Sequence, residues 1–456
     1  MEEDRAARGE RYAQRLARML QLKTIYQEEE GADGADRGPH EGEFAGEFEK
    51  FRALVRELFP LLHEKCEFEC VGGTLLYRWR GATEKGALAL MSHHDVVEAG
   101  GEWSHEPFGG EIADGRVWGR GALDIKGNLF CIMQAVEELL EAGYEPAQDV
   151  YVISSNCEEK GGNDLVADLL AERGADISVL VDEGSPMQPF PAGGVEGEGA
   201  FVALGEKGSA KVRCIARGTG GHPMLPGRRS PLPRLGAFMA EIDEKGLVPV
   251  RMNPLSSAFL ARLANLLEGE RAEAARALAA CEDVADPALL DAVDPALRDV
   301  IGTTVAFTLA HGADAAYTMP TEAWVLGNVR IATGNSVEEV MDALNALAER
   351  YDLEIKLEKS GEPSPAADPD GEGMARIERA LAVAAPGVPM MPFMLAGGTD
   401  TKHFLKLCEC VRFTALHISS TQQPTIHGID ENVDVDTLPR GVDFFKALIR
   451  DDGALA

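Results

Sequence analysis

The sequence predicts an α/β protein with a mostly parallel main sheet, helices on both faces of that sheet, and an inserted α+β region. In the first half of the chain, short and continuously apolar runs alternate with helical patterns, which is typical of parallel strands buried on both faces. From about residue 206 the strand-like runs alternate apolar and polar residues, as strands with one exposed face do. The first pattern returns after a Pro/Gly/Asp-rich stretch at 359–373.

The individual elements of the first half follow from hydrophobic periodicity. Apolar residues at helical spacing predict amphipathic helices, and compact apolar runs that end in polar residues predict strands. A loop rich in Gly, Glu and Asp separates the first two helices. The predicted helices cover 3–22, 44–63 and 126–143, and the predicted strands cover 74–80, 87–94, 149–155 and 177–183.

The middle of the chain has a different character. Alternating strands are predicted at 207–220, 321–332 and 353–359, and helices are predicted at about 229–244, 256–281 and 336–350. Strands with one apolar and one polar face, combined with helices, are typical of a separate α+β layer. We therefore expect a discontinuous catalytic domain formed by 1–205 and 360–456, interrupted by an inserted domain at 206–359.

Composition narrows the classes of function. With 456 residues the chain exceeds the usual size of a single core, and its 45% apolar content is ordinary for a globular protein. The net charge of −32 makes nucleic acid and anionic membranes poor partners. The N-terminus lacks the apolar core of a signal peptide, and the sequence has no run long enough to span a bilayer, so a cytoplasmic location is expected. The eight cysteines form no CxxC pair, which favours free thiols.

Two segments place a histidine and carboxylates where strands end. MSHHDVV has HxD spacing, in which His93 would ligate a metal and Asp95 would fix its orientation. In WGRGALDIKGN, Asp124 stands just before a helix. Taken singly, each has a structural interpretation that is more common, as a histidine in a turn or as a helix N-cap.

Three further segments add carboxylates and a second histidine. SSNCEEKGG places Glu158 and Glu159 directly after an apolar strand, where adjacent like charges cost free energy unless a cation or proton neutralises them. One glutamate can bind metal while its neighbour acts as a general base. His427 lies in TIHGIDEN, and Asp182 and Glu183 end another strand. Mixed nitrogen and oxygen ligands suit zinc, with manganese and cobalt as alternatives.

In their order along the chain these segments resemble the co-catalytic zinc hydrolase family of aminoacylase, carboxypeptidase S and succinyl-diaminopimelate desuccinylase. The resemblance runs from about residue 65 to 445. The matching blocks are SHHDVV, WSHEPFGGEIADGRVWGRGALDIKG, CEEKGG, VDEG, GGTDTKHF and IHGIDEN. It implies a zinc-peptidase sheet and two Zn²⁺ per subunit.

The resemblance also assigns roles to individual residues. It implies that His93 binds one metal, that His427 binds the other and that Asp124 bridges both. Glu159 would be a further ligand, Glu158 the general base, and Asp95 the residue that orients His93. The remaining ligand falls in VDEG, where the carboxypeptidase S branch implies Asp182 and the aminoacylase branch implies Glu183; we predict Asp182.

The inserted domain resembles the family's lid and dimerisation domain. The resemblance implies that His222, in GTGGHPMLPGR, reaches the active site of a second subunit and stabilises an oxyanion. Arg330 would grip a substrate carboxylate. Lys402 stands where the family commonly has arginine, which weakens bidentate binding of a carboxylate there.

The predicted activity is hydrolysis of an amide bond next to a free carboxylate, as a dipeptidase or carboxypeptidase on short peptides. The alternative is an N-acyl amino acid amidohydrolase of the aminoacylase type. A third reading is a metal-binding interaction protein whose catalysis has lapsed. Only two departures from the family pattern, Cys157 and Lys402, support it, and the retained Glu158 argues against it. We expect a homodimer through the lid domain.

Overall fold

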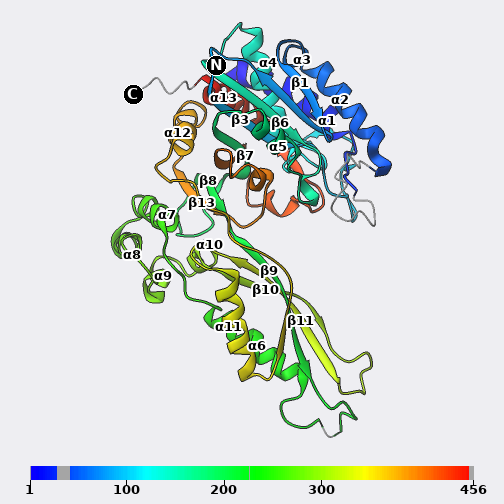
Figure 1. Cartoon of the computed structure of the whole chain (residues 1–456), viewed down its shortest axis with the longest axis vertical. Helices are drawn as coiled ribbons and strands as arrows, with labels where there is room; N and C mark the ends of the chain where they lie inside the picture. The colour runs from blue at the N-terminus through cyan, green and yellow to red at the C-terminus, as the bar shows by residue number, and fades with distance from the viewer. Residues whose placement is uncertain (1, 28–41, 225, 451–456) are drawn as a thin grey trace.

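The computed structural model describes residues 2–27, 42–224 and 226–450. Figure 1 shows a large sheet wrapped by helices and, extending away from it, a narrower part built on a second sheet. Among the helices of the described residues, none is both long and apolar enough to cross a bilayer.

The large sheet has eight strands in the order β1-β2-β6-β3-β7-β14-β8-β13. Its centre is parallel, because β3 pairs in parallel with β6 and β7, and β7 pairs in parallel with β14. β2 pairs antiparallel with β1 and β6, β8 pairs antiparallel with β7 and β14, and the edge strand β13 pairs with β8 in parallel. The predicted class is confirmed. The strand bounds are β1 Glu67–Val71, β2 Thr74–Trp79, β3 Thr83–His93, β6 Gln148–Ser155, β7 Ile177–Pro189, β8 Glu198–Glu206, β13 Met390–Leu395 and β14 Glu409–His417.

Successive residues of the central strands pack on opposite faces of this sheet. Leu88 and Leu90 of β3 join the larger apolar cluster, whereas Ala89 and Met91 join a smaller one that includes residues of α5 (Leu165–Glu172). Such two-sided burial explains the continuous apolar runs in the sequence. The larger cluster includes residues of α1 (Glu2–Leu20), α2 (Ala45–Leu58), α3 (Pro60–Lys65), α4 (Lys126–Glu141), α12 (Glu372–Ala384) and α13 (Thr437–Arg450).

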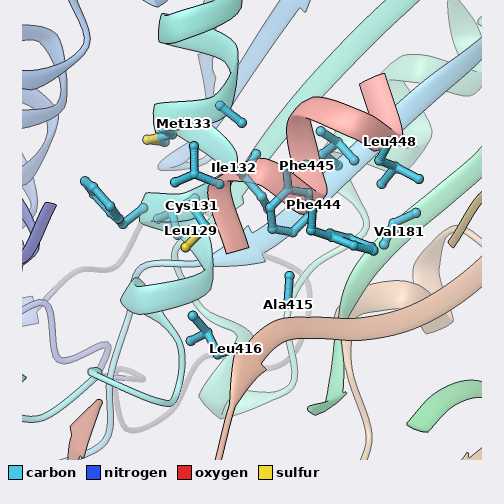
Figure 2. Close-up of a cluster of buried hydrophobic side chains, with 14 of the residues drawn as sticks. Leu129, Cys131, Ile132, Met133, Val181, Ala415, Leu416, Phe444, Phe445 and Leu448 are labelled. Carbon is cyan, nitrogen blue, oxygen red and sulfur yellow. The ribbon is translucent and has the colours of Figure 1, made fainter. Parts of the chain in front are cut away.

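Helices α4 and α13 meet above the sheet in this larger cluster. Figure 2 shows Leu129 and Ile132 of α4 beside Phe444 and Phe445 of α13, over Ala415 of β14. All five side chains are at most 1% exposed. Burial of each phenylalanine contributes roughly 1.5–3 kcal/mol, so this packing holds the start of α4 firmly against the sheet.

The second sheet is antiparallel, in the order β10-β11-β9-β12. Alternate residues of β9 and β11 are buried against α6 and α11, as their alternating sequence predicts. The bounds are β9 Gly208–Arg217, β10 Thr304–His311, β11 Glu322–Ile331, β12 Glu354–Gly361, α6 Pro231–Lys245 and α11 Val337–Arg350.

Four short helices between α6 and β10 belong to neither face of that second sheet. They form their own apolar cluster, which includes Phe201 of β8 and Met391 of β13, so they pack against the edge of the large sheet. The helix predicted at 256–281 is two helices, with a break before Gly269, whose φ is 59°. The bounds are α7 Pro254–Ala264, α8 Gly269–Ala279, α9 Pro287–Val293 and α10 Leu297–Ile301.

The helix predicted at 44–63 is also broken, between α2 and α3. Pro60 lacks an amide hydrogen and disfavours helical geometry at the preceding residue. Phe59 accordingly has φ −125° and ψ 64°.

A small third sheet joins two distant segments beside the large one. β5 (Arg116–Trp118) pairs with β4 (Glu111–Ala113) on one side and with β15 (Asn432–Asp434) on the other, both antiparallel. The pairing of Trp118 with Asn432 brings the segment after β5 next to the segment before β15. These two segments carry Asp124 and His427.

Candidate metal centre

The parallel centre of the large sheet brings the predicted acids and histidines together. His93 is the last residue of β3, and its register partner in β6 is Ser155, just before the turn Glu158–Lys160. Glu183 lies on the neighbouring strand β7. Parallel strands end at a common edge, which is where open α/β sheets bind ligands.

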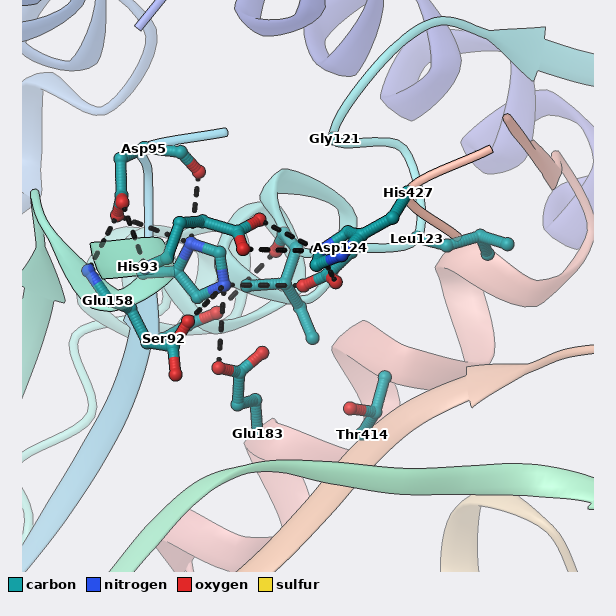
Figure 3. A network of polar contacts seen from close by, with 12 residues as sticks. Ser92, His93, Asp95, Gly121, Leu123, Asp124, Glu158, Glu183, Thr414 and His427 are labelled. Carbon is teal, nitrogen blue, oxygen red and sulfur yellow. Dashed lines mark hydrogen bonds and ion pairs between the residues drawn. The ribbon is translucent and has the colours of Figure 1, made fainter. Parts of the chain in front are cut away.

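Asp124 lies between the two histidines. Its Oδ1 is 3.2 Å from Nε2 of His93, and its Oδ2 is 3.0 Å from Nε2 of His427. Glu159 approaches His427 as well, with Oε2 at 3.1 Å from Nε2. Figure 3 shows the Asp124 carboxylate reaching toward both rings. This is the arrangement in which one carboxylate can be shared by two cations.

Two further carboxylates approach His93 from the other side. Glu183 Oε1 lies 3.4 Å from Nε2 of His93, and Glu158 Oε2 lies 3.8 Å from the same nitrogen. The ligand atoms of His93, Asp124 and Glu159 all lie within 4.8 Å of one another, as do those of His93, Glu158 and Glu183. Imidazole nitrogen and carboxylate oxygen are the donors that zinc accepts, so the residues fit a metal centre.

Asp95 holds this site through two parts of the residue. Its main-chain oxygen lies 2.9 Å from Nδ1 of His93. This contact leaves Nε2 of His93 directed at the cluster of carboxylates formed by Asp124, Glu158 and Glu183. Its carboxylate accepts hydrogen bonds from the backbone N–H groups of Glu158 and Glu159, both at 3.1 Å, and lies 3.4 Å from the imidazole. Asp95 therefore fixes both the ring and the glutamate turn.

The geometry favours Glu183 over the predicted Asp182 as the remaining acidic ligand. Successive side chains of a strand point to opposite faces, so only one of the two can face the cluster. Asp182 Oδ1 accepts a hydrogen bond from the backbone N–H of Glu183, and its buried Oδ2 has no hydrogen-bond partner among the described residues. Figure 3 shows Glu183 directed at His93.

Burial and mutual repulsion shift the protonation of the cluster. Burial, followed by the charge of Glu183, raises the pKa of Glu158 to about 10, and burial raises the pKa of Glu183 to about 7. Hydrogen bonds to Asp124 and Glu159 raise the pKa of His427 to about 10. Burial opposes the charged form of His93, but Glu183 and Asp124 outweigh it and raise the pKa of His93. At neutral pH Glu158 and His427 therefore hold protons, which a bound cation would displace.

A cavity of about 550 Å³ opens next to the cluster. Asp124, Glu158, Glu159, Glu183 and His427 line one part of it. Lys402 also lines the cavity. Apolar side chains form much of the remaining wall: Leu123, Ile125, Pro186, Leu395, Ile418 and Ile426.

Two predicted site residues, His222 and Arg330, belong to the second sheet and its connections and not to the segments that carry the acids and histidines. His222 belongs to the connection between β9 and α6, which lies in Figure 1 at the end of the second sheet that is remote from the large one. It is exposed, and its Nδ1 accepts a hydrogen bond from the backbone N–H of Met224 at 3.1 Å. Arg330 is exposed near the end of β11. The structure does not bring these two residues to the predicted metal ligands of the same chain.

Sequence reasoning missed a buried ion pair beside the cluster. Glu431 and Arg120 are 0% and 1% exposed, and their side chains meet at 2.6 Å. Both belong to segments that carry predicted ligands, but the sequence has no signal that the two segments meet.

Comparison with known proteins adds a family match. The model of Peptidase family M20/M25/M40 matches residues 89–451. The probable carboxypeptidase S-like 2 of Dictyostelium discoideum is 28% identical over 462 residues, covering 96% of this chain and 84% of that protein. The N-fatty-acyl-amino acid synthase/hydrolase PM20D1 of Homo sapiens is 26% identical over 375 residues, covering 79% and 73%.

Solved structures share the fold. Human carnosine dipeptidase 1 superposes with a TM-score of 0.66 at 14% identity, over 98% of this chain and 97% of that one. The M20 family metallo-carboxypeptidase Sso-CP2 of Sulfolobus solfataricus gives 0.66 at 18% identity, over 95% and 97%.

Proposed function

The chain belongs to the peptidase family M20/M25/M40, a family of metal-dependent hydrolases, and we propose that it is a two-zinc enzyme that cleaves an amide bond next to a free carboxylate. Its substrates would be short peptides, cleaved as by a dipeptidase or carboxypeptidase. The observation that carries the proposal is the Asp124 carboxylate, which reaches both His93 and His427 at 3.2 and 3.0 Å.

We assign the ligands from these distances. His93 and Glu183 would hold one Zn²⁺, His427 and Glu159 the other, and Asp124 both. This set replaces Asp182 with Glu183, in keeping with the 3.4 Å approach of Glu183 to His93. Manganese and cobalt are alternatives for the same ligands.

Glu158 is the proposed general base. A metal pair supplies Lewis acidity and lowers the pKa of a water. The carboxylate of Glu158 lines the cavity and points at the cluster, so it can take a proton from water and return it to the leaving nitrogen. Asp95 would keep Glu158 in place through the hydrogen bond it accepts from the backbone N–H of Glu158.

The substrate carboxylate is proposed to meet Lys402, which lines the cavity. Arg330, which we predicted to share this role, does not line the cavity of its own chain. A second candidate activity, hydrolysis of N-acyl amino acids, is favoured by the apolar wall, which suits an acyl chain. The relatives named N-fatty-acyl-amino acid synthase/hydrolase also point to this activity.

One experiment tests this proposal directly. Zinc is quantified in the purified protein, and turnover is measured on dipeptides and N-acyl amino acids, each with a free or an amidated carboxylate, with and without a chelator. We expect two zinc ions and chelator-sensitive cleavage of the free acids. Equal cleavage of free and amidated substrates would contradict the proposed recognition of the substrate carboxylate. Metal binding without any turnover would favour a metal-binding interaction protein that has lost its catalytic activity.

A homodimer through the second sheet is also proposed, with His222 contributing to the partner's cavity. The support is the exposure of His222 and of two nearby apolar side chains, Met224 at 75% and Tyr317 at 80%. Mixing Glu158→Gln with His222→Ala subunits tests it, because a mixed dimer regains one complete site. Random exchange would restore about a quarter of the wild-type activity, and no recovery after verified exchange would contradict it. A cytoplasmic location stays a prediction.

A further inference from the structure

We propose that Glu431 is a positioning residue that, together with Arg120, locks the segment carrying Asp124 to the segment carrying His427. The inference rests on the proposed function, since it concerns the second metal of that same site. Neither residue lines the cavity, so any effect on catalysis must pass through the ligands they hold.

The carboxylate of Glu431 accepts hydrogen bonds from the segment that leads to Asp124. Its Oε1 accepts hydrogen bonds from the backbone N–H groups of Leu123 and Asp124, at 2.8 and 3.0 Å. Its Oε2 accepts from the N–H of Gly121, at 3.0 Å, and from Nη1 of Arg120, at 2.6 Å. Four donors therefore converge on one buried side chain, and three of them belong to the backbone that leads to the shared ligand.

Arg120 completes the connection in the opposite direction. Its Nη2 donates to the main-chain oxygen of Gly428 at 2.8 Å, next to His427, and to that of Glu98 at 3.4 Å. The ring of Trp103 lies 5.2 Å from its guanidinium carbon. Each segment thus supplies the side chain that holds the backbone of the other.

The free-energy cost of burying this ion pair indicates a role beyond stabilising the fold. A buried salt bridge often contributes no more to folding than apolar residues of the same volume. His427 has a φ of 57° and a half-exposed side chain, so its own packing does little to hold its ring. Backbone pairing helps, since the N–H of Gly119 donates to the main-chain oxygen of Glu431 at 2.9 Å. The side-chain contacts then fix the separation between Asp124 and His427.

Glu431→Gln is the informative variant because it keeps the shape but replaces one acceptor oxygen by an amide nitrogen, which cannot accept a hydrogen bond. Glu137→Gln is the matched control. Glu137 is 7% exposed, and its carboxylate accepts the backbone N–H groups of Leu61 and Leu62, at 3.0 and 2.8 Å. It lies on α4, well along that helix from Asp124.

The test is a metal titration that needs no substrate. Metal-free protein is titrated with Co²⁺ and with Zn²⁺ against a competing chelator, and the absorption spectrum of bound Co²⁺ and the melting temperature are recorded. We expect Glu431→Gln to bind the first metal normally and the second about 10- to 100-fold more weakly, the range for outer partners of metal ligands. Glu137→Gln should lower the melting temperature but leave both affinities unchanged.

The outcomes separate this inference from the proposed function. Wild-type protein that binds fewer than two metals overturns the proposed function. Two metals in the wild type with equal affinities in Glu431→Gln overturn the positioning role alone, as does an equal loss in Glu137→Gln. If Glu431→Gln does not fold, Arg120→Lys keeps the buried charge but gives up the second nitrogen that reaches Gly428. It should weaken the second metal alone, and unchanged binding in that variant also overturns the inference.

Discussion

The two sides of the candidate metal centre are built in different ways. His93 ends a strand of the large sheet, its side chain is 1% exposed, and the main-chain oxygen of Asp95 fixes its ring. His427 lies in a loop, in a left-handed backbone conformation, and its side chain is 51% exposed. Asp124 joins the two sides.

This difference separates two routes to an ordered ligand. A ligand on a buried strand is ordered by the packing that folds the sheet, at no further cost in entropy. A ligand on an exposed loop needs contacts of its own, because ordering the backbone costs about 1–2 kcal/mol per residue. We therefore expect the metal on the His93 side to bind more tightly and to exchange more slowly than the metal on the His427 side.

The largest expected effect comes from Glu158, on the His93 side. Glu158→Gln keeps the shape of the side chain but cannot take a proton, so kcat should fall about 10²–10⁴-fold, the range for a general base. Both metals should stay bound, because the proposed ligands are unchanged. Steady-state kinetics and metal analysis on the same preparation measure both quantities.

The neighbouring glutamate supplies the control for that variant. Glu159→Gln removes a proposed ligand of the His427 side, so it should lose metal as well as turnover. Near-normal turnover in Glu158→Gln, or loss of metal from Glu158→Gln but not from Glu159→Gln, would reverse the roles that we assign to the pair.

The second prediction compares the histidines directly. His427→Ala should retain one metal and lose the other, with the weaker affinity falling by about 100-fold or more, since outer partners alone account for 10- to 100-fold. His93→Ala should reduce metal binding on its side and also lower the melting temperature, because it leaves buried carboxylates without their partner. Equal melting temperatures for the two variants would show that the sides are equivalent.

Much of the fold could be predicted from the sequence because its signals are local. The buried parallel strands appear as continuous apolar runs, and β9 and β11 as alternating ones, since burial on two faces or one face dictates those patterns. The errors are local too: Pro60 divides a predicted helix, and the predicted helix at 256–281 breaks before Gly269. The helices that pack on β8 and β13 could not be assigned to that edge, because an apolar stripe does not specify its partner.

The residues of the site also fall into those that the sequence could predict and those that it could not. The acids and histidines at strand ends were recognisable, and the parallel sheet brings them together. Asp182 and Glu183 could not be separated, because the choice depends on which face of β7 each residue takes, a shift of one position. The contact between Glu431 and Arg120 could not be predicted for a different reason, because it depends on the pairing of β5 with β15.

The response of the two sides to pH is the most gradual of the predicted effects. In metal-free protein the pKa of His427 is raised to about 10, so this ring carries a proton at neutral pH that a metal must displace. Affinity on the His427 side should then rise about tenfold per pH unit between pH 7 and 9, one proton being released. Below pH 7 the His93 side should respond more steeply, because Glu183, with a pKa of about 7, also gives up a proton there.

Stability without metal should change in the opposite sense. A raised pKa means that the folded chain holds the proton more tightly than the unfolded chain, so the contribution of His427 is complete below about pH 6.5, the ordinary histidine value. It is then lost as the pH rises toward 10. Melting temperatures of metal-free protein should fall over that interval, and His427→Ala should flatten this fall, whereas alanine at His105, outside the cluster, should not.

Calorimetric zinc titrations in buffers of different ionisation enthalpy count the released protons. An equal proton count for wild type and His427→Ala would remove the distinction between the two sides.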